Sequence, residues 1–167
     1  MSFANRICQT LHEEHRATIA LMERLEQLMA KFGRGGIPDR QDPTVARMLG
    51  DLSVGVEAEV ARHFDFEEHQ LFPFLEAVGD SAIGEHLTSE HAAMRPLGLR
   101  MAHLAREASA NGFDAASWEE FRKIGQELSD RMLAHVQKEE MALLPLLDEV
   151  MDAEVEARLY QDYVETM

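Results

Sequence analysis

The chain is poor in cysteine and in basic residues, and each shortage excludes a class of protein. Its 167 residues include one cysteine, Cys8, so no disulfide can form within the chain, and we expect a reducing compartment such as the cytoplasm. Lys and Arg number 16 against 31 Asp and Glu, which gives a formal net charge of −15. Such a surface repels phosphate backbones, so we expect no nucleic-acid partner.

Patterns typical of sheets, signal peptides and membrane spans are also missing. Runs of β-branched residues with a period of two, which would indicate strands, do not occur. Residues 1–15 contain charges and lack a long apolar run, so we expect neither a signal peptide nor a membrane anchor. Hydrophobic residues make up 46% of the chain. This length and composition suit one domain over residues 1–167 with its own core.

The pattern that is present is helical periodicity. Apolar residues recur every three to four positions in long segments, which groups of Gly, Pro, Asn and Asp separate. We predict an all-α fold, an up-down-up-down four-helix bundle with a short extra C-terminal helix. Pro73 should kink or interrupt its helix. The predicted helices cover about residues 3–32, 44–78, 81–110, 115–150 and 153–164, and the bundle core covers about residues 8–150.

Two segments of the chain repeat one pattern at an offset of 72 residues. Residues 63–75 and 135–147 each contain a His, a Glu four positions later, a second Glu directly after it, and a Pro six positions after the first Glu. Side chains four positions apart lie on one face of a helix, about 5–6 Å apart. Each segment therefore offers an imidazole and a carboxylate to the same side of its helix. The pairs are His63 with Glu67 and His135 with Glu139.

The other two long helices each contain a histidine that follows a glutamate. The pairs Glu14-His15 and Glu90-His91 are 76 residues apart rather than 72, a difference that loops of unequal length allow. If the bundle has internal twofold symmetry, four His and two Glu meet in its interior. The six candidate metal ligands are His15, His63, Glu67, His91, His135 and Glu139.

These residue types suit a pair of metal ions. Imidazole nitrogen and carboxylate oxygen both bind iron, and a carboxylate from each half can bridge two ions about 3.5–4 Å apart. The lack of further cysteines argues against a thiolate zinc site. One His-x-x-x-Glu pair alone is more often a surface pair on a helix. The metal prediction therefore depends on the repeat and on the two additional histidines.

The ordered set of motifs resembles the hemerythrin-like, His-His-Glu cation-binding family. The matching motifs are His15-Arg16, Glu90-His91 and the two repeated segments, and they cover about residues 8–150. The resemblance implies a four-helix bundle with two non-haem iron ions, joined by an oxo, hydroxo or carboxylate bridge, with zinc or manganese as substitutes. It implies that the four histidines are terminal ligands and that Glu67 and Glu139 bridge the ions.

The chain departs from the oxygen-carrying members of that family. Those proteins place two His four positions apart on the third helix, whereas Arg95 follows His91 here. They also have an Asp five positions after the last helical His, whereas Glu139 follows His135 by four. With four His rather than five, the chain is closer to the branch linked to iron sensing, nitric-oxide handling and repair of iron centres. Reversible O₂ carriage is disfavoured.

Several polar residues near the predicted ligands have more than one interpretation. His12 is an extra ligand or an outer partner of one, and Glu59 is a candidate hydrogen-bond acceptor for a ligand. Glu68 and Glu140 are expected to face solvent or to bond a ligand His rather than to bind metal. Surface positions or polar contacts between helices are expected for His69, His86 and His103, and a buried helical position for Cys8.

The resemblance implies a metal protein that binds, senses or reduces O₂, NO or peroxide, with one of these small molecules as its partner. Redox chemistry would reside in the metals, because the chain has no separate acid-base or nucleophilic machinery, and enzyme activity stays open. The alternative is a non-catalytic iron or oxygen sensor or a metal-storage module. A third interpretation is a bundle that takes whichever divalent ion is abundant. We expect a monomer or homodimer without a membrane partner.

Overall fold

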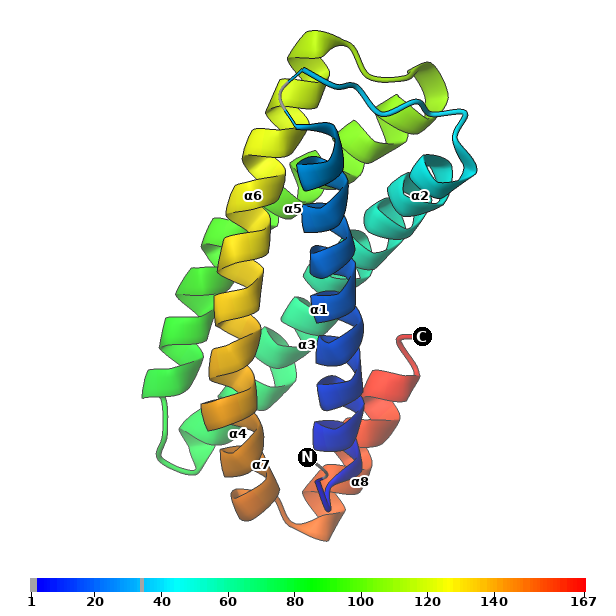
Figure 1. Cartoon of the computed structure of the whole chain (residues 1–167). Coiled ribbons are helices and arrows are strands. Elements are labelled where there is room, and N and C mark those ends of the chain that lie inside the picture. The colour runs from blue at the N-terminus through cyan, green and yellow to red at the C-terminus, as the bar shows by residue number, and fades with distance from the viewer. Residues whose placement is uncertain (1–2, 34) are drawn as a thin grey trace.

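The computed structural model describes residues 3–33 and 35–167, and their regular elements are all helical (Figure 1). This confirms the predicted all-α class, and the predicted helix ranges agree with the structure to within a few residues. The up-down-up-down order of a four-helix bundle stays a prediction. The α-helices are α1 (Arg6–Phe32), α2 (Pro43–Ala58), α3 (Phe64–Phe66), α4 (Phe72–Ala77), α5 (Ala82–Asn111), α6 (Ala115–Lys138), α7 (Leu144–Val150) and α8 (Ala153–Val164), and the π-helical turns are η1 (Glu59–His63), η2 (Glu67–Leu71) and η3 (Glu139–Leu143).

Each repeated segment contains a π-helical turn that ends two residues before its proline. Pro73 and Pro145 occupy the second positions of α4 and α7, which follow η2 and η3. Proline has no N–H for the carbonyl four residues earlier, and its ring collides with that carbonyl in a regular helix. A π turn, with hydrogen bonds that span five residues, is a wider alternative. The helix therefore continues through Pro73 with a changed hydrogen-bond pattern.

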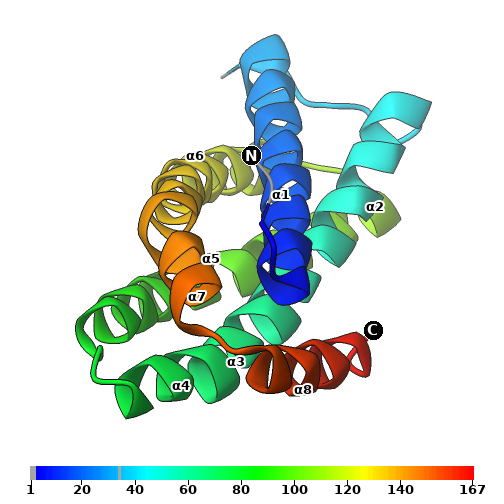
Figure 2. The same ribbon diagram turned by 90° about the horizontal axis from the view of Figure 1, so that it is seen from below.

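The long helices enclose a common interior (Figure 2). Helix α1 contacts α2 and α6, and α5 contacts the same two helices. The contact of α5 with α2 and η1 is close because Gly98 has no side chain. A Cβ at this position would lie 2.9 Å from Val60 and 3.1 Å from Val56. Helix α8 packs against α1, near the N-terminus of the chain (Figure 1).

The buried apolar side chains form two clusters, and the candidate ligands lie between them along the chain. On α1, Leu11 belongs to one cluster and Met22 to the other, and His15 lies between these two residues. On α5, His91 likewise lies between Leu87 of one cluster and Met94 of the other. A layer of polar side chains therefore interrupts the core, and the apolar packing on both sides holds these side chains in place.

The exposed apolar residues are spread over different elements. Val54 on α2, Leu99 on α5 and Met141 on η3 are the most exposed large ones inside helices. Such single residues are normal on a protein surface. Among the helices of residues 3–33 and 35–167, none combines the length and the apolar character that a bilayer crossing requires.

Cys8 lies in the smaller apolar cluster, which confirms its predicted buried position. It is 0% exposed, and its Sγ lies 3.6 Å from the carbonyl oxygen of Leu144, to which the thiol donates. Burial raises the pKa of the Cys8 thiol to about 12. The thiol is therefore a core group and is not ionised at neutral pH.

We expect Cys8 to resist alkylation in the folded protein. Only the thiolate reacts, and both the raised pKa and the packing suppress it, so iodoacetamide near pH 8 should label the native chain at least about 100-fold more slowly than the unfolded chain. Mass spectrometry of samples quenched over time, with and without urea, measures both rates. Native labelling within a few-fold of the unfolded rate would contradict the burial of this thiol.

Candidate metal centre

The structure brings the six predicted ligands together in the interior. Each is at most 1% exposed. They form two groups of four whose ligand atoms lie within 4.8 Å of one another, and both groups include Glu67 and Glu139. One group adds His15 from α1 and His63 from η1, and the other adds His91 from α5 and His135 from α6.

The two glutamates fit a bound cation because their oxygens lack other partners. All four carboxylate oxygens of Glu67 and Glu139 are buried without a hydrogen bond among the described residues. The same holds for Nε2 of His15 and of His63. A buried carboxylate without a partner is costly, and metal coordination is one of the few ways to satisfy it. The set consists of hard oxygen and imidazole nitrogen donors, which first-row divalent ions accept.

The distances between donor atoms are those of ligands that surround an ion. His91 Nε2 lies 3.1 Å from His135 Nε2, and two nitrogens about 2.1 Å from one ion at a right angle are roughly 3 Å apart. Glu67 Oε1 lies 3.3 Å from His91 Nε2, and Glu139 Oε1 lies 2.8 Å from His135 Nε2. In the other group, His63 Nε2 lies 3.4 Å from Glu67 Oε2, and His15 Nε2 lies 3.7 Å from Glu139 Oε1.

Each histidine turns its second ring nitrogen, Nδ1, toward a carboxylate outside the ligand set. A carboxylate at Nδ1 places the ring proton there, so that Nε2 keeps a lone pair for a metal ion. In every pair the two residues come from different helical segments. Three pairs are hydrogen-bonded at Nδ1: His63 with Glu14 at 3.0 Å, His91 with Glu68 at 3.1 Å and His135 with Glu90 at 2.8 Å. In the fourth, His15 Nδ1 lies 3.4 Å from Glu140 without a hydrogen bond among the described residues.

A third layer of donors fixes the outer carboxylates. Each of the four accepts a hydrogen bond from, or forms an ion pair with, a further side chain outside the ligand set. These contacts offset part of the negative charge that four outer carboxylates would otherwise concentrate around the site. The donors are Arg62 and Tyr163 to Glu14, Arg95 to Glu68, Lys138 to Glu90 and His12 to Glu140.

Aromatic packing orients one ligand ring more strongly than the others. The Phe64 ring stacks on His91 with a centroid distance of 3.9 Å and an interplanar angle of 7°. Phe72 stacks on the same imidazole at 5.9 Å. The equivalent residues in the second half, Val136 and Leu144, are aliphatic. The two metal positions therefore have different surroundings in spite of their matched ligands.

Without metal, His15 and His135 hold protons at neutral pH. Burial alone would lower the pKa of His15, but the adjacent Glu139 and Glu140 outweigh it and raise this pKa to about 10. Burial is likewise outweighed at His135, where Glu139 raises the pKa to about 9. Burial and the neighbouring Glu139 raise the pKa of Glu67. Metal ions must therefore displace protons from these imidazoles when they bind.

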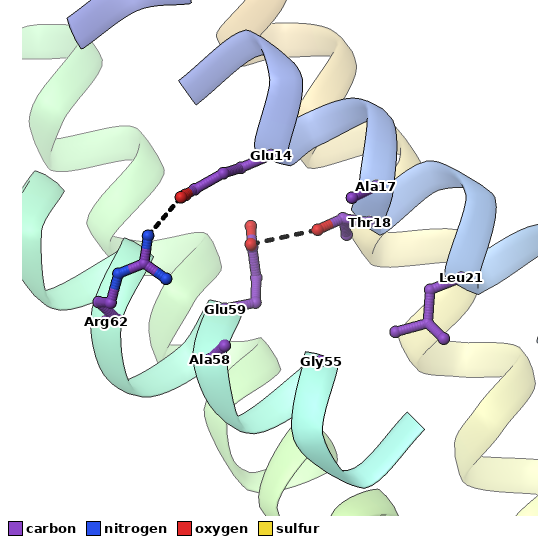
Figure 3. A pocket seen from close by; sticks show the side chains of 8 residues that line it. All are labelled: Glu14, Ala17, Thr18, Leu21, Gly55, Ala58, Glu59 and Arg62. Atoms are coloured by element: carbon purple, nitrogen blue, oxygen red, sulfur yellow. Dashed lines mark hydrogen bonds and ion pairs between the residues drawn. The ribbon is translucent and has the colours of Figure 1, made fainter. Parts of the chain in front are cut away.

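A pocket of about 170 Å³ lies between α1 and the α2–η1 segment (Figure 3). Glu59 points into it and is only 5% exposed. Its Oε2 accepts a hydrogen bond from Thr18 at 3.2 Å and lies 3.6 Å from His63 Nδ1. None of the six predicted ligands lines this pocket, but Glu14 and Glu59, which do, both lie near His63 Nδ1. Glu59 is thus beside a ligand, as the sequence suggested.

The other sequence interpretations have clear outcomes in the structure. His12 lies outside both four-donor groups and contacts Glu140. His69 is exposed, and its Nδ1 lies 2.8 Å from the carbonyl oxygen of Asp65. His103 is also exposed, and His86 contacts Lys138 at 3.3 Å.

Sequence reasoning did not assign roles to Glu14 and Glu90. Each directly precedes a predicted ligand, His15 or His91, but contacts the histidine of another segment. The signal was present as the repeated Glu-His dipeptide. Which histidine each glutamate contacts depends on how the helices face each other, and the sequence pattern of one chain does not give that arrangement. The role of Tyr163 had no comparable signal.

Loss of a shared carboxylate should abolish metal binding. Glu67→Ala or Glu139→Ala removes a donor from both groups, so we expect metal content below half of the wild-type value. Glu68→Ala removes an outer partner and should weaken binding about 10- to 100-fold. His69→Ala is the matched control and should bind normally. Metal analysis after equilibration, with circular dichroism to confirm folding, measures these effects; equal losses in Glu139→Ala and His69→Ala would contradict the site.

The metal-free protein should lose stability as the pH rises. The folded-state pKa values of His15 and His135, about 10 and about 9, lie above the unfolded value of about 6.5. Their stabilisation is therefore complete below about pH 6.5 and is lost as the pH passes through 9 to 10. Urea unfolding at a series of pH values, with metal removed, measures the free energy of unfolding. A flat or rising profile across this window would contradict these protonated pairs.

Comparison with known families matches residues 6–147 to the hemerythrin HHE cation binding domain. No curated protein matches the chain. The matched range includes all six buried donors and both repeated segments, and it ends within α7, before α8. On this match over most of its length, the chain belongs to the hemerythrin HHE cation-binding domain family.

Proposed function

We propose that the six donors hold two iron ions and that the protein binds, senses or reduces O₂, NO or peroxide there. His15 and His63 would hold one ion, His91 and His135 the other, and Glu67 and Glu139 would bridge them. The observation that carries this proposal is that two four-donor groups share both buried carboxylates. A shared pair of carboxylates indicates two ions at short separation, as in other two-metal sites.

Charge balance also favours two divalent ions. Burial raises the pKa of Glu67, and repulsion between Glu67 and the nearby Glu139 raises it further. Cations between them remove that repulsion and satisfy all four oxygens. The four outer carboxylates add negative charge that arginines and a lysine only partly cancel. The site as a whole therefore attracts positive charge.

Burial favours a small reaction partner. The six donors are at most 1% exposed, and the Phe64 and Phe72 rings pack beside His91. A large organic substrate has no room to reach the donor atoms, whereas a diatomic molecule or peroxide can pass through small fluctuations of the packing. The apolar rings also keep bulk water away from the site.

Bound iron would supply one-electron redox steps. The chain's own residues orient the donors: three outer carboxylates hydrogen-bond Nδ1 of His63, His91 and His135. The stacked Phe64 fixes the plane of His91. None of the described groups around the donors forms a nucleophile-and-base pair of the kind used in covalent catalysis. Any turnover would therefore rest on the metals.

A second candidate function is a non-catalytic sensor or metal store. The observation that favours it is the enclosure of the donors, because ions buried between four helical segments stabilise the fold when they bind. Four protein donors per ion would also satisfy zinc in a tetrahedral site. Metal identity and turnover separate these candidates from the main proposal.

We expect two irons per chain in protein purified after expression in iron-replete medium. Elemental analysis gives the metal and its ratio to protein, and a near-ultraviolet absorption spectrum reports ferric ions that are held close together. Glu139→Ala serves as the control and should lack both the metal and the absorption. One zinc per chain, or no metal in the wild-type protein, would refute the di-iron proposal.

We expect reduced, anaerobic protein to react with NO, O₂ or peroxide at the metal site. Consumption of many equivalents per site indicates a redox enzyme, whereas reaction that stops at one equivalent indicates a sensor or carrier. Stopped-flow absorption together with reagent electrodes measures both quantities. His69→Ala should behave as wild type. No reaction with any of the three molecules would refute the proposed function.

A further inference from the structure

Helix α8 reaches the metal centre through one buried tyrosine. Tyr163 is 0% exposed, and its hydroxyl donates to Glu14, the carboxylate that accepts from His63 Nδ1. Both bonds end on the same oxygen, Oε1 of Glu14. A continuous chain of hydrogen bonds therefore runs from α8 to a candidate ligand.

The surroundings of Tyr163 hold its hydroxyl in this position. The Phe66 ring lies 4.4 Å from its ring centroid, and the Arg62 guanidinium lies 4.7 Å away on a ring face. Arg62 also pairs with the other oxygen of Glu14 and donates to Thr166 at 3.2 Å. Both carboxylate oxygens of Glu14 are therefore held. Oε1 accepts from Tyr163 of α8, and Oε2 accepts from Arg62.

The charge state of these groups suits a fixed acceptor. Burial raises the pKa of Tyr163, which keeps the hydroxyl protonated and able to donate. The geometry is consistent with this role, because Oε1 of Glu14 accepts from the Tyr163 hydroxyl and lies 3.0 Å from His63 Nδ1.

The second half of the protein has no counterpart of this arrangement. Glu90, which accepts from His135, is held by Lys138, whose side chain is 46% exposed. No helix equivalent to α8 covers that side among the described residues. Helix α8 also lies outside residues 6–147, the range that the family match covers. The contact therefore distinguishes one of the two metal positions in this chain.

We propose that Tyr163 is a positioning residue for the ligand His63, acting through Glu14, so that docked α8 stabilises the metal position held by His15 and His63. This rests on the proposed metal-binding function. A hydrogen bond that fixes Glu14 also fixes the imidazole of His63 and favours the tautomer with a free Nε2. By linkage, metal at this position and docking of α8 must stabilise each other by the same factor.

The test compares Tyr163→Phe with Tyr160→Phe. Both variants remove one hydroxyl from α8, but Tyr160 is only half-buried, and its ring lies on Arg6 rather than on the metal centre. Each protein is loaded anaerobically with Fe²⁺ and mixed with excess chromogenic chelator. In Tyr163→Phe, we expect one of the two ions to leave about 3- to 10-fold faster and the other at the wild-type rate, as loss of one outer hydrogen bond would give. Tyr160→Phe should match wild type.

Amide hydrogen exchange supplies a second measurement that does not depend on the rate of Fe²⁺ release. In wild type and Tyr160→Phe, metal loading should slow amide exchange in α8, and in Tyr163→Phe this dependence should disappear. The positioning role would be overturned if Tyr163→Phe lost Fe²⁺ at the wild-type rate. It would also be overturned if both ions left equally faster than in wild type. Wild-type protein that binds no Fe²⁺ would instead refute the proposed function itself.

Discussion

The structure depends on two buried carboxylates at the centre of its polar layer. Glu67 and Glu139 are 0% exposed, and none of their four oxygens accepts a hydrogen bond from the described residues. Every other feature of the interior relates to them. Four imidazoles surround them, four outer carboxylates orient the imidazoles, and cationic or hydroxyl groups hold those carboxylates. The arrangement is unfavourable as a core of a metal-free bundle and favourable as a cage for cations.

The polar layer has a structural cost that the apolar clusters on either side must offset. A core of this size would be more stable if it were apolar throughout, because buried ionic groups contribute little net stability. The interruption of packing is therefore best understood as a functional feature. It also explains why α1, α5 and the repeated segments each carry a His between two apolar stretches. Metal binding would then contribute directly to the stability of the fold.

The internal repeat is closely matched in its ligands and unequal in its surroundings. The two halves present the same donors. The Phe64 ring stacks on His91 and meets His135 edge-on, both in one group of donors, whereas Tyr163 contacts Glu14 beside His63. Arg95, four positions after His91, pairs with Glu68, the outer partner of His91. The site is thus symmetric in its ligands and asymmetric in the groups that tune them, and two ions there would have different properties.

The sequence by itself determined the helical class and the approximate helix ranges, and it singled out the six residues that the structure gathers in the interior. Helical periodicity and four-residue spacing are local properties, so one chain is enough to reveal them. The sequence also placed Glu68 and Glu140 near the ligands and Cys8 in the core. Only the tertiary structure decided which carboxylate serves which histidine, since Glu14 and Glu90 bond to rings on other helical segments. The same holds for Tyr163, which is 149 residues from Glu14 in the chain. Contacts between distant segments depend on how helices pack, and periodicity within one helix carries no information about its neighbours' register.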